Sequence, residues 1–185
     1  SFEHSESEQR TITAISADRI EITLNQSLNY MHLAVEETHG TDKISMRSEV
    51  GLISRNIKVQ GDSTSVAKNY GAHVMMHGSA KDGLVGRIAY SEFTHCGQPA
   101  IVGRYCIHFH MNGDVSDSYV RGNAVHHSFA RVLTLHAVYY LTVEYNVGYW
   151  VRGHNIFLED GIEQYNVIQY NLMISSLQVF NMLQT

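Results

Sequence analysis

The sequence predicts an all-β protein, most of it a right-handed, single-stranded parallel β-helix. From residue 51 onward, short runs of β-forming residues are separated by Gly and Asn, and no apolar stripe with helical spacing continues over three turns. Asn123, Asn146 and Asn171 recur at steps of 23 and 25 residues, with the flanking apolar positions in register. A repeat of this length suits one coil of a β-helix, which buries its apolar face only by stacking on its neighbours.

The strands of the coils follow from the short β-rich runs. They are predicted at residues 57–59, 73–76, 87–90, 107–109, 132–135 and 141–143. Asparagine tolerates left-handed backbone at turns, and stacked Asn side chains can hydrogen-bond along the stack. Ser91 takes the Asn position in the preceding coil, and residues 55–59 are interpreted as an earlier one. The alternative is that the asparagines are three unrelated turn residues.

The second half of each coil also aligns in columns. Two columns are apolar and one is polar: Ile107, Leu133 and Ile156; Phe109, Leu135 and Leu158; His110, His136 and Glu159. Because adjacent strands lie about 4.8 Å apart, the three polar side chains are expected in one row. His108 either shares the environment of His110 or is separated from it by a bend, and the sequence leaves both open.

The first 50 residues have a different pattern. Residues 11–15 and 20–24 alternate with period two and predict a hairpin, with Ile20, Ile22 and Leu24 on one half-buried face. Two further apolar stretches of strand length cover residues 28–35 and 44–50, and the polar segment 36–42 between them reads as a loop. A domain boundary is therefore predicted between residues 50 and 51.

Composition limits the classes of function. The chain has 185 residues and a formal net charge of -5, and its 13 Lys and Arg are scattered rather than clustered, so no nucleic-acid partner is expected. No apolar run approaches the roughly 20 residues that span a bilayer, and the start has no signal-peptide pattern. The two cysteines, Cys96 and Cys106, either pair in an oxidising compartment or remain as buried thiols.

The row of His110, His136 and Glu159 is the main candidate site. Two imidazoles and a carboxylate can bind a divalent metal. With Asp160 or Asp114 as a second carboxylate, the same residues could perform acid–base catalysis on a sugar chain. The alternative is a hydrogen-bonded polar ladder that sets the register of the coils.

Other clusters are weaker candidates. Glu159, Asp160 and Glu163 form an acidic cluster with oxygen ligands for calcium, but no twelve-residue calcium loop is present. His126 and His127 are interpreted as corner or surface residues, and His127 aligns with His95. Several aromatic residues are interpreted as core and corner packing, with stacking against sugar rings as the alternative: Tyr139, Tyr140, Tyr145, Tyr149 and Trp150.

Four segments resemble a known family. Residues 49–57, 103–110, 118–123 and 157–163 are similar to the fibrocystin and fibrocystin-L family, and more distantly to the cell-migration-inducing hyaluronidase and its transmembrane relative. The resemblance implies that residues 1–50 are the C-terminal part of a G8 domain and that residues 51–185 are β-helix repeats continuing beyond the chain. At Cys106 the family usually has proline, and this replacement either permits a bond to Cys96 or relaxes the turn.

The resemblance also implies a function. Such a chain belongs to a large extracellular glycoprotein at the cell surface, including cilia, with its membrane anchor outside this segment. It implies a receptor-like or structural scaffold that binds a glycan or protein ligand and contacts neighbouring domains of its own chain. The alternative implied by the hyaluronidase branch is an enzyme that degrades hyaluronan or a similar polysaccharide through His110, His136, Glu159 and Asp160, with calcium or another divalent metal as the candidate cofactor.

Overall fold

The computed structural model describes residues 3–179. The chain divides into two compact units, residues 1–50 and residues 51–185. Within residues 3–179, helices are confined to three short turns, η1 (His4–Glu6), α1 (Ser65–Lys68) and η2 (Ala80–Asp82). In the described part of the chain, no helix has the length and apolar character needed to cross a membrane.

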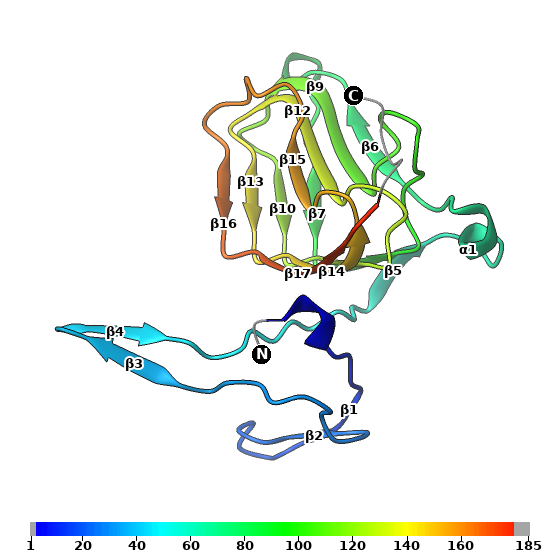
Figure 1. Cartoon of the computed structure of the whole chain (residues 1–185). Coiled ribbons are helices and arrows are strands. Elements are labelled where there is room, and N and C mark those ends of the chain that lie inside the picture. Colours follow the sequence, from blue (N-terminus) through cyan, green and yellow to red (C-terminus); the bar gives the residue numbers. More distant parts are fainter. Residues whose placement is uncertain (1–2, 180–185) are drawn as a thin grey trace. The chain divides into compact units, whose positions relative to one another are not determined.

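The second unit is a parallel β-helix, as predicted, and each complete coil adds one strand to each of three sheets (Figure 1). The first sheet holds β16 (Val167–Gln169), β13 (Thr142–Glu144), β10 (Tyr119–Arg121) and β7 (Arg87–Ala89). The second holds β17 (Leu172–Leu177), β14 (Val147–Arg152), β11 (Ala124–His126), β8 (Ser91–Thr94) and β5 (Ile57–Gln60). The third holds β15 (Ile156–Leu158), β12 (Leu133–Tyr139), β9 (Ile107–Asp114) and β6 (Val74–His77).

The predicted register between coils is confirmed. Leu133 pairs with Ile107 on one side and Ile156 on the other, and His136 pairs with His110. The interior between the sheets is apolar, and its fully buried members include Phe109, Leu135, Val138, Leu141, Val143 and Val151. Burying an aliphatic or aromatic side chain of this size stabilises a fold by about 1.5–3 kcal/mol. Stacking of like residues therefore holds successive coils in register.

The asparagine column forms a hydrogen-bonded ladder, as predicted. Asn123 Nδ2 donates to Asn146 Oδ1 at 3.0 Å, and Asn146 Nδ2 donates to Asn171 Oδ1 at 2.9 Å. The backbone N–H of Ser91 donates to Asn123 Oδ1, so Ser91 takes the predicted place at one end. The buried amide groups are thus paired between coils rather than with solvent.

The expected left-handed backbone of these asparagines is wrong. The residue before each Asn takes this conformation instead: Gly122 has φ 65°, Tyr145 57° and Tyr170 53°. The left-handed residue turns the chain between the first and second sheets, and the Asn side chain that follows points inward to bond the next coil. The tyrosines at this corner are exposed, and the rings of Tyr145 and Tyr170 stack with centroids 5.2 Å apart.

The aromatic cluster packs at the corners, which is one of the two roles expected for it. Tyr140 is 44% exposed and Trp150 is 43% exposed, so these two residues are not part of the core. Tyr140 stacks on Tyr165 with ring centroids 4.8 Å apart. Along the corners, these rings therefore stack on the rings of the next coil.

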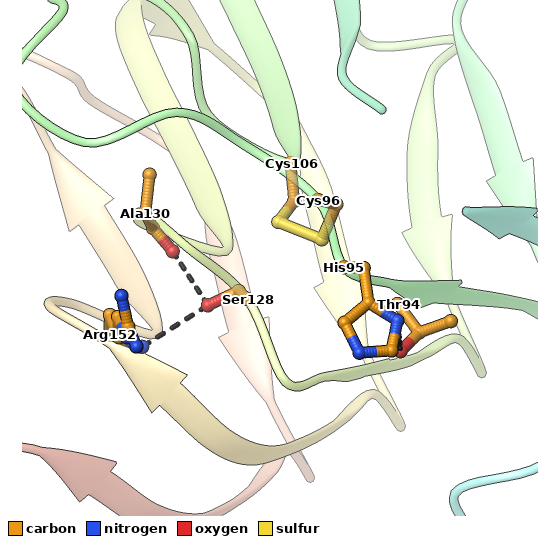
Figure 2. Close-up of a disulfide and its surroundings, with 7 residues drawn as sticks. All are labelled: Thr94, His95, Cys96, Cys106, Ser128, Ala130 and Arg152. Carbon is orange, nitrogen blue, oxygen red and sulfur yellow. Dashed lines mark hydrogen bonds between the residues drawn. A yellow bond between two sulfur atoms is a disulfide. The ribbon is translucent and has the colours of Figure 1, made fainter. Parts of the chain in front are cut away.

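Cys96 and Cys106 form a disulfide (Figure 2). Both are fully buried, and the bond closes the loop that leads from β8 to β9. Figure 2 also shows the hydroxyl of Ser128, which donates to Ala130 O at 2.7 Å and accepts from the backbone N–H of Arg152 at 3.2 Å. Of the two alternatives for the cysteines, the structure has the bonded one.

The first unit contains two antiparallel hairpins. The predicted hairpin is present as β1 (Ile12–Ile15) and β2 (Ile22–Leu24), but its expected half-buried face is wrong, because Ile20 is 80% exposed and Ile22 is 55% exposed. Among the side chains described between residues 3 and 50, none is buried. Alternation alone identifies a strand, and burial needs a second layer that this unit does not contain.

The second hairpin corrects another expectation. The segment 36–42, predicted as a loop, forms β3 (Glu36–His39), the turn and the first residue of β4 (Asp42–Ser45). Of the two stretches predicted as strands, residues 28–35 contain no strand, and residues 44–50 are strand only at 44 and 45. Gly40, with φ 65°, lies in the turn. Glu36 pairs with Lys43 at 3.2 Å across the strands. Opposite charges and a tight turn thus support a hairpin that has no apolar face.

Candidate functional site

The third sheet brings the predicted polar row together at one point. His110 on β9 lies beside His136 on β12, and Glu159 follows β15 directly, with its backbone N–H donating to Leu135 O at 2.9 Å. Since side chains alternate along a strand, His108 lies on the same face as His110, opposite the core residue Phe109. The open question about His108 is thus answered: it shares the environment of His110.

His108 is buried by the loop that the disulfide closes. It is 1% exposed, and its Nδ1 lies 3.0 Å from the carbonyl oxygen of Gly103. A carbonyl oxygen only accepts hydrogen bonds, so Nδ1 carries the proton and Nε2 of the neutral ring has the free lone pair. Nε2 is buried, and within residues 3–179 it makes no hydrogen bond.

The donor atoms of four residues converge on one small space. His110 Nδ1 and His136 Nδ1 are hydrogen-bonded to each other at 3.1 Å, and one ligand atom from each of the three histidines lies within 4.8 Å of the others. Glu159 Oε2 is 3.7 Å from His108 Nε2 and 3.7 Å from His136 Nδ1. Like His108 Nε2, this oxygen is buried and has no hydrogen-bond partner in the described chain. We call His108, His110, His136 and Glu159 the His108 cluster.

Neighbouring residues orient the His108 cluster. Asp160 Oδ2 lies 3.0 Å from His136 Nε2, so His136 donates from Nε2 and directs the Nδ1 lone pair to the cluster. Tyr105 donates its hydroxyl proton to Glu159 Oε1 at 2.9 Å and accepts from Arg131 Nη1 at 3.1 Å. The guanidinium of Arg131 lies over the Phe157 ring, 3.6 Å from its centroid. Glu159 is thus held by one oxygen, which leaves Oε2 directed at the histidines.

Burial lowers the pKa of two imidazoles of the cluster, those of His108 and His110. Burial lowers the pKa of His108 to about 4, and the nearby histidines and Arg131 act in the same direction, against the hydrogen bond to Gly103 O. Burial also lowers the pKa of His110, with His136 and His77 adding to the effect. At neutral pH these rings therefore present lone pairs rather than positive charge.

The remaining predicted residues are not part of this cluster. Asp114 Oδ1 accepts from the backbone N–H of Ser116 at 3.0 Å in the turn after β9, and no interaction described for residues 3–179 joins it to the histidines. Glu163 Oε1 accepts from the backbone of Ala137 at 3.0 Å and Asp160 at 3.2 Å. The three carboxylates proposed for calcium thus have separate partners, and their arrangement gives that hypothesis no support.

A second group of histidines lies on the second sheet. We call His95, His126, His127, Glu92 and Lys58 the His126 cluster. His126 Nε2 lies 3.1 Å from Glu92 Oε1, which also binds Lys58 Nζ at 2.7 Å. Burial lowers the pKa of His126, and Glu92 opposes this change. Both oxygens of Glu92 have partners here, which fits the predicted structural role at a corner.

The sequence left the place of His108 in the site open and did not indicate Tyr105 or Arg131. His108 had a signal in its spacing of two residues from His110, and Tyr105 lies within a segment that carries the family resemblance. Arg131 had no signal, because nothing in its neighbourhood distinguishes a buried cation from a turn residue. The coil stacking that brings Arg131 to Glu159 is a tertiary feature.

Comparisons with known proteins agree with the fold. Fibrocystin-L of Mus musculus is 36% identical over 206 residues, which cover 91% of this chain and 5% of the relative. A G8 domain-containing protein of Dictyostelium discoideum is 37% identical over 166 residues, covering 90% of this chain and 13% of the relative. The human cell surface hyaluronidase CEMIP2 is 37% identical over 149 residues, covering 71% of this chain and 10% of the relative.

These matches confirm the family resemblance seen in the sequence. The chain spans only 5% to 13% of the length of these relatives. The family model described as the CEMIP beta-helix matches residues 69–184, which is more than half of the chain. The chain belongs to the CEMIP beta-helix family.

Proposed function

We propose that residues 51–179 act as a rigid structural module in the extracellular part of a large cell-surface glycoprotein. The observation that carries this proposal is the continuous apolar interior, along which the asparagine ladder pairs buried amides from coil to coil. A relative named as a cell surface protein supports the location. The module would present a surface for a glycan or protein ligand and hold neighbouring domains at a fixed spacing, with its membrane anchor elsewhere and cilia among its locations.

A glycan-degrading enzyme is the second candidate function. It is favoured by the name of the hyaluronidase relative and by a partly accessible site, where the side chains of His136 and Asp160 are 23% and 40% exposed. The arrangement of the carboxylates argues against it. Glycosidases hold the sugar between two carboxyl groups, whereas here the imidazole of His136 lies between Glu159 and Asp160, which contact its two nitrogens.

A digestion assay distinguishes the two functions. The full 185-residue chain would be incubated with size-graded hyaluronan, with and without calcium, beside a double variant with His136→Ala and Glu159→Ala. We expect the length distribution of the polymer to stay unchanged in every sample. Cleavage by the unmodified chain that is lost in a folded double variant would establish the enzyme and refute a purely structural role.

Limited proteolysis tests the structural role directly. A rigid module with paired backbone groups resists cleavage, so we expect a resistant fragment that begins near Gly51, where the second unit starts. Rapid cutting at many sites between residues 51 and 179 would contradict the proposal, because it would show that the coils open readily.

A further inference from the structure

We propose that His108, His110, His136 and Glu159 bind a divalent late transition-metal ion, with Zn²⁺ as the expected ion and three nitrogens and one oxygen as ligands. The proposal does not depend on the structural role of the module. It differs from the sequence hypothesis in adding the buried His108 as a ligand and in excluding calcium.

Two buried acceptor atoms of the His108 cluster face each other without a positive charge between them. His108 Nε2 and Glu159 Oε2 face each other at 3.7 Å, and both are buried without a hydrogen bond in the described chain. The contact of Nδ1 with Gly103 O leaves Nε2 with a lone pair, so neither atom of the pair supplies a proton. Two buried acceptors at this distance repel each other, and a cation between them removes the repulsion.

Neighbouring side chains orient the other ligands, His136 and Glu159, toward the same point. Asp160 holds His136 through Nε2, and this carboxylate–histidine arrangement is the one that directs a free imidazole nitrogen at a metal. Tyr105 holds Oε1 of Glu159 and leaves Oε2 for the ion. Supporting hydrogen bonds of this kind set the direction of the ligands before the ion binds, and a polar ladder that only sets register has no need of them.

The distances between the ligand atoms are close to those of a tetrahedral metal site. In a tetrahedral site with bonds of about 2.05 Å, ligand atoms lie about 3.3 Å apart. The Nδ1 atoms of His110 and His136 are 3.1 Å apart, and the two distances from Glu159 Oε2 to His108 and His136 are both 3.7 Å. The ligand atoms of the three histidines all lie within 4.8 Å of one another. Small rotations of the partly exposed rings of His110 and His136 bring these atoms to the shorter spacing of a metal site.

The donor set also selects the kind of ion. Calcium takes six to eight oxygen ligands, whereas imidazole suits zinc, copper and nickel. The carboxylates of Glu159 and Asp160 and the guanidinium of Arg131 together carry a formal charge of -1. A divalent ion is therefore electrostatically favoured, and the partly exposed side of His136 provides its route of entry.

Metal titration of the full 185-residue chain tests the proposal. The chain, prepared without a histidine tag and treated with a chelator, would be titrated with Zn²⁺, Co²⁺ and Ca²⁺. We expect one tight equivalent of Zn²⁺ or Co²⁺ and the visible absorption of four-coordinate Co²⁺, with no comparable response to Ca²⁺. X-ray absorption of the zinc form should show three imidazole nitrogens and one oxygen.

Variants locate the site. Glu159→Gln keeps the shape of the side chain and should weaken Zn²⁺ binding by at least about 100-fold, while Asp160→Asn should weaken it by about 10–100-fold. His127→Asn, in the His126 cluster, is the matched control and should leave the affinity unchanged. Circular dichroism would confirm that each variant is folded.

The outcomes are decisive in both directions. The proposal is overturned if the folded chain binds neither Zn²⁺ nor Co²⁺, if Ca²⁺ binds as tightly, or if Glu159→Gln and Asp160→Asn bind like the unmodified chain. If a variant does not fold, the ligand count from X-ray absorption of the unmodified chain decides, because fewer than three imidazoles would refute the assignment. None of these results depends on the hyaluronan assay, so the two proposals can fail separately.

Discussion

Asn146→Ala should be strongly destabilising, because Asn146 is the central member of the asparagine ladder. Its Oδ1 accepts from the backbone and side-chain N–H groups of Asn123, both at 3.0 Å. Its Nδ2 donates to Val120 O and Asn171 Oδ1, both at 2.9 Å. Alanine removes all four hydrogen bonds while leaving the strands themselves unchanged.

The expected loss follows from the partners that remain. The side chain of Asn123 keeps its bond to Ile88 O, but the buried backbone N–H of Asn123 and the carbonyl of Val120 lose their side-chain partner. A neutral hydrogen bond contributes about 1 kcal/mol net, and an unpaired buried group costs about 1–3 kcal/mol. We therefore expect the free energy of unfolding to fall by about 3–5 kcal/mol.

Equilibrium urea unfolding measures this loss. The single tryptophan, Trp150, lies on β14, so its fluorescence reports on the β-helix and not on residues 1–50. Asn155→Ala is the matched control, because Asn155 donates one exposed hydrogen bond, to Ser176, and should cost less than about 1 kcal/mol. If Asn146→Ala were no more destabilising than Asn155→Ala, the ladder would not hold the coils together and the reasoning would be refuted.

Three further predictions concern stability. Replacing Cys96 and Cys106 by alanine should lower the free energy of unfolding by about 3 kcal/mol, since the bond closes a loop with a separation of 10 residues; an unchanged urea midpoint after reduction would contradict this. Because burial lowers the pKa of His126 below its unfolded value of 6.5, the free energy of unfolding should decrease as the pH falls below 6.5. His126→Gln should make this decrease smaller. An equal dependence of the free energy of unfolding on pH in both proteins would contradict this prediction. Gly122→Ala should cost about 1–2 kcal/mol by thermal unfolding, because alanine is strained at φ 65°; no change would mean that the corner relaxes freely.

Much of the β-helix could be predicted because its information is local and repeated. The spacing of Asn123, Asn146 and Asn171 indicates the length of the coil, and the apolar positions around them set which residues stack. One register then orders every strand, so the amino-acid pattern alone is enough to align His110 and His136 in one row. The backbone conformation at the corners was harder to predict from the sequence. The left-handed residue precedes the Asn, and in two of these three coils it is a tyrosine, which rarely adopts this conformation.

In the first unit, the sequence pattern predicted a hairpin but not which of its side chains are exposed. Alternation located the hairpin that contains Ile22, but it could not reveal that this face is exposed, since burial depends on which other segment packs there. The hairpin around Gly40 had an apolar signal only at Ile44, near the end of its second strand. Its cross-strand ion pair between Glu36 and Lys43 only exists once the turn has formed.

The sequence by itself determined the architecture, the register of the coils and the polar row on the third sheet. Only the tertiary structure decided that the disulfide forms, that the loop it closes buries His108, and that Tyr105 and Arg131 reach Glu159 from other coils. The physical reason is the difference in range. Register follows from a repeat that each coil shares with the next, whereas a binding site depends on the directions of lone pairs from residues that no repeat relates.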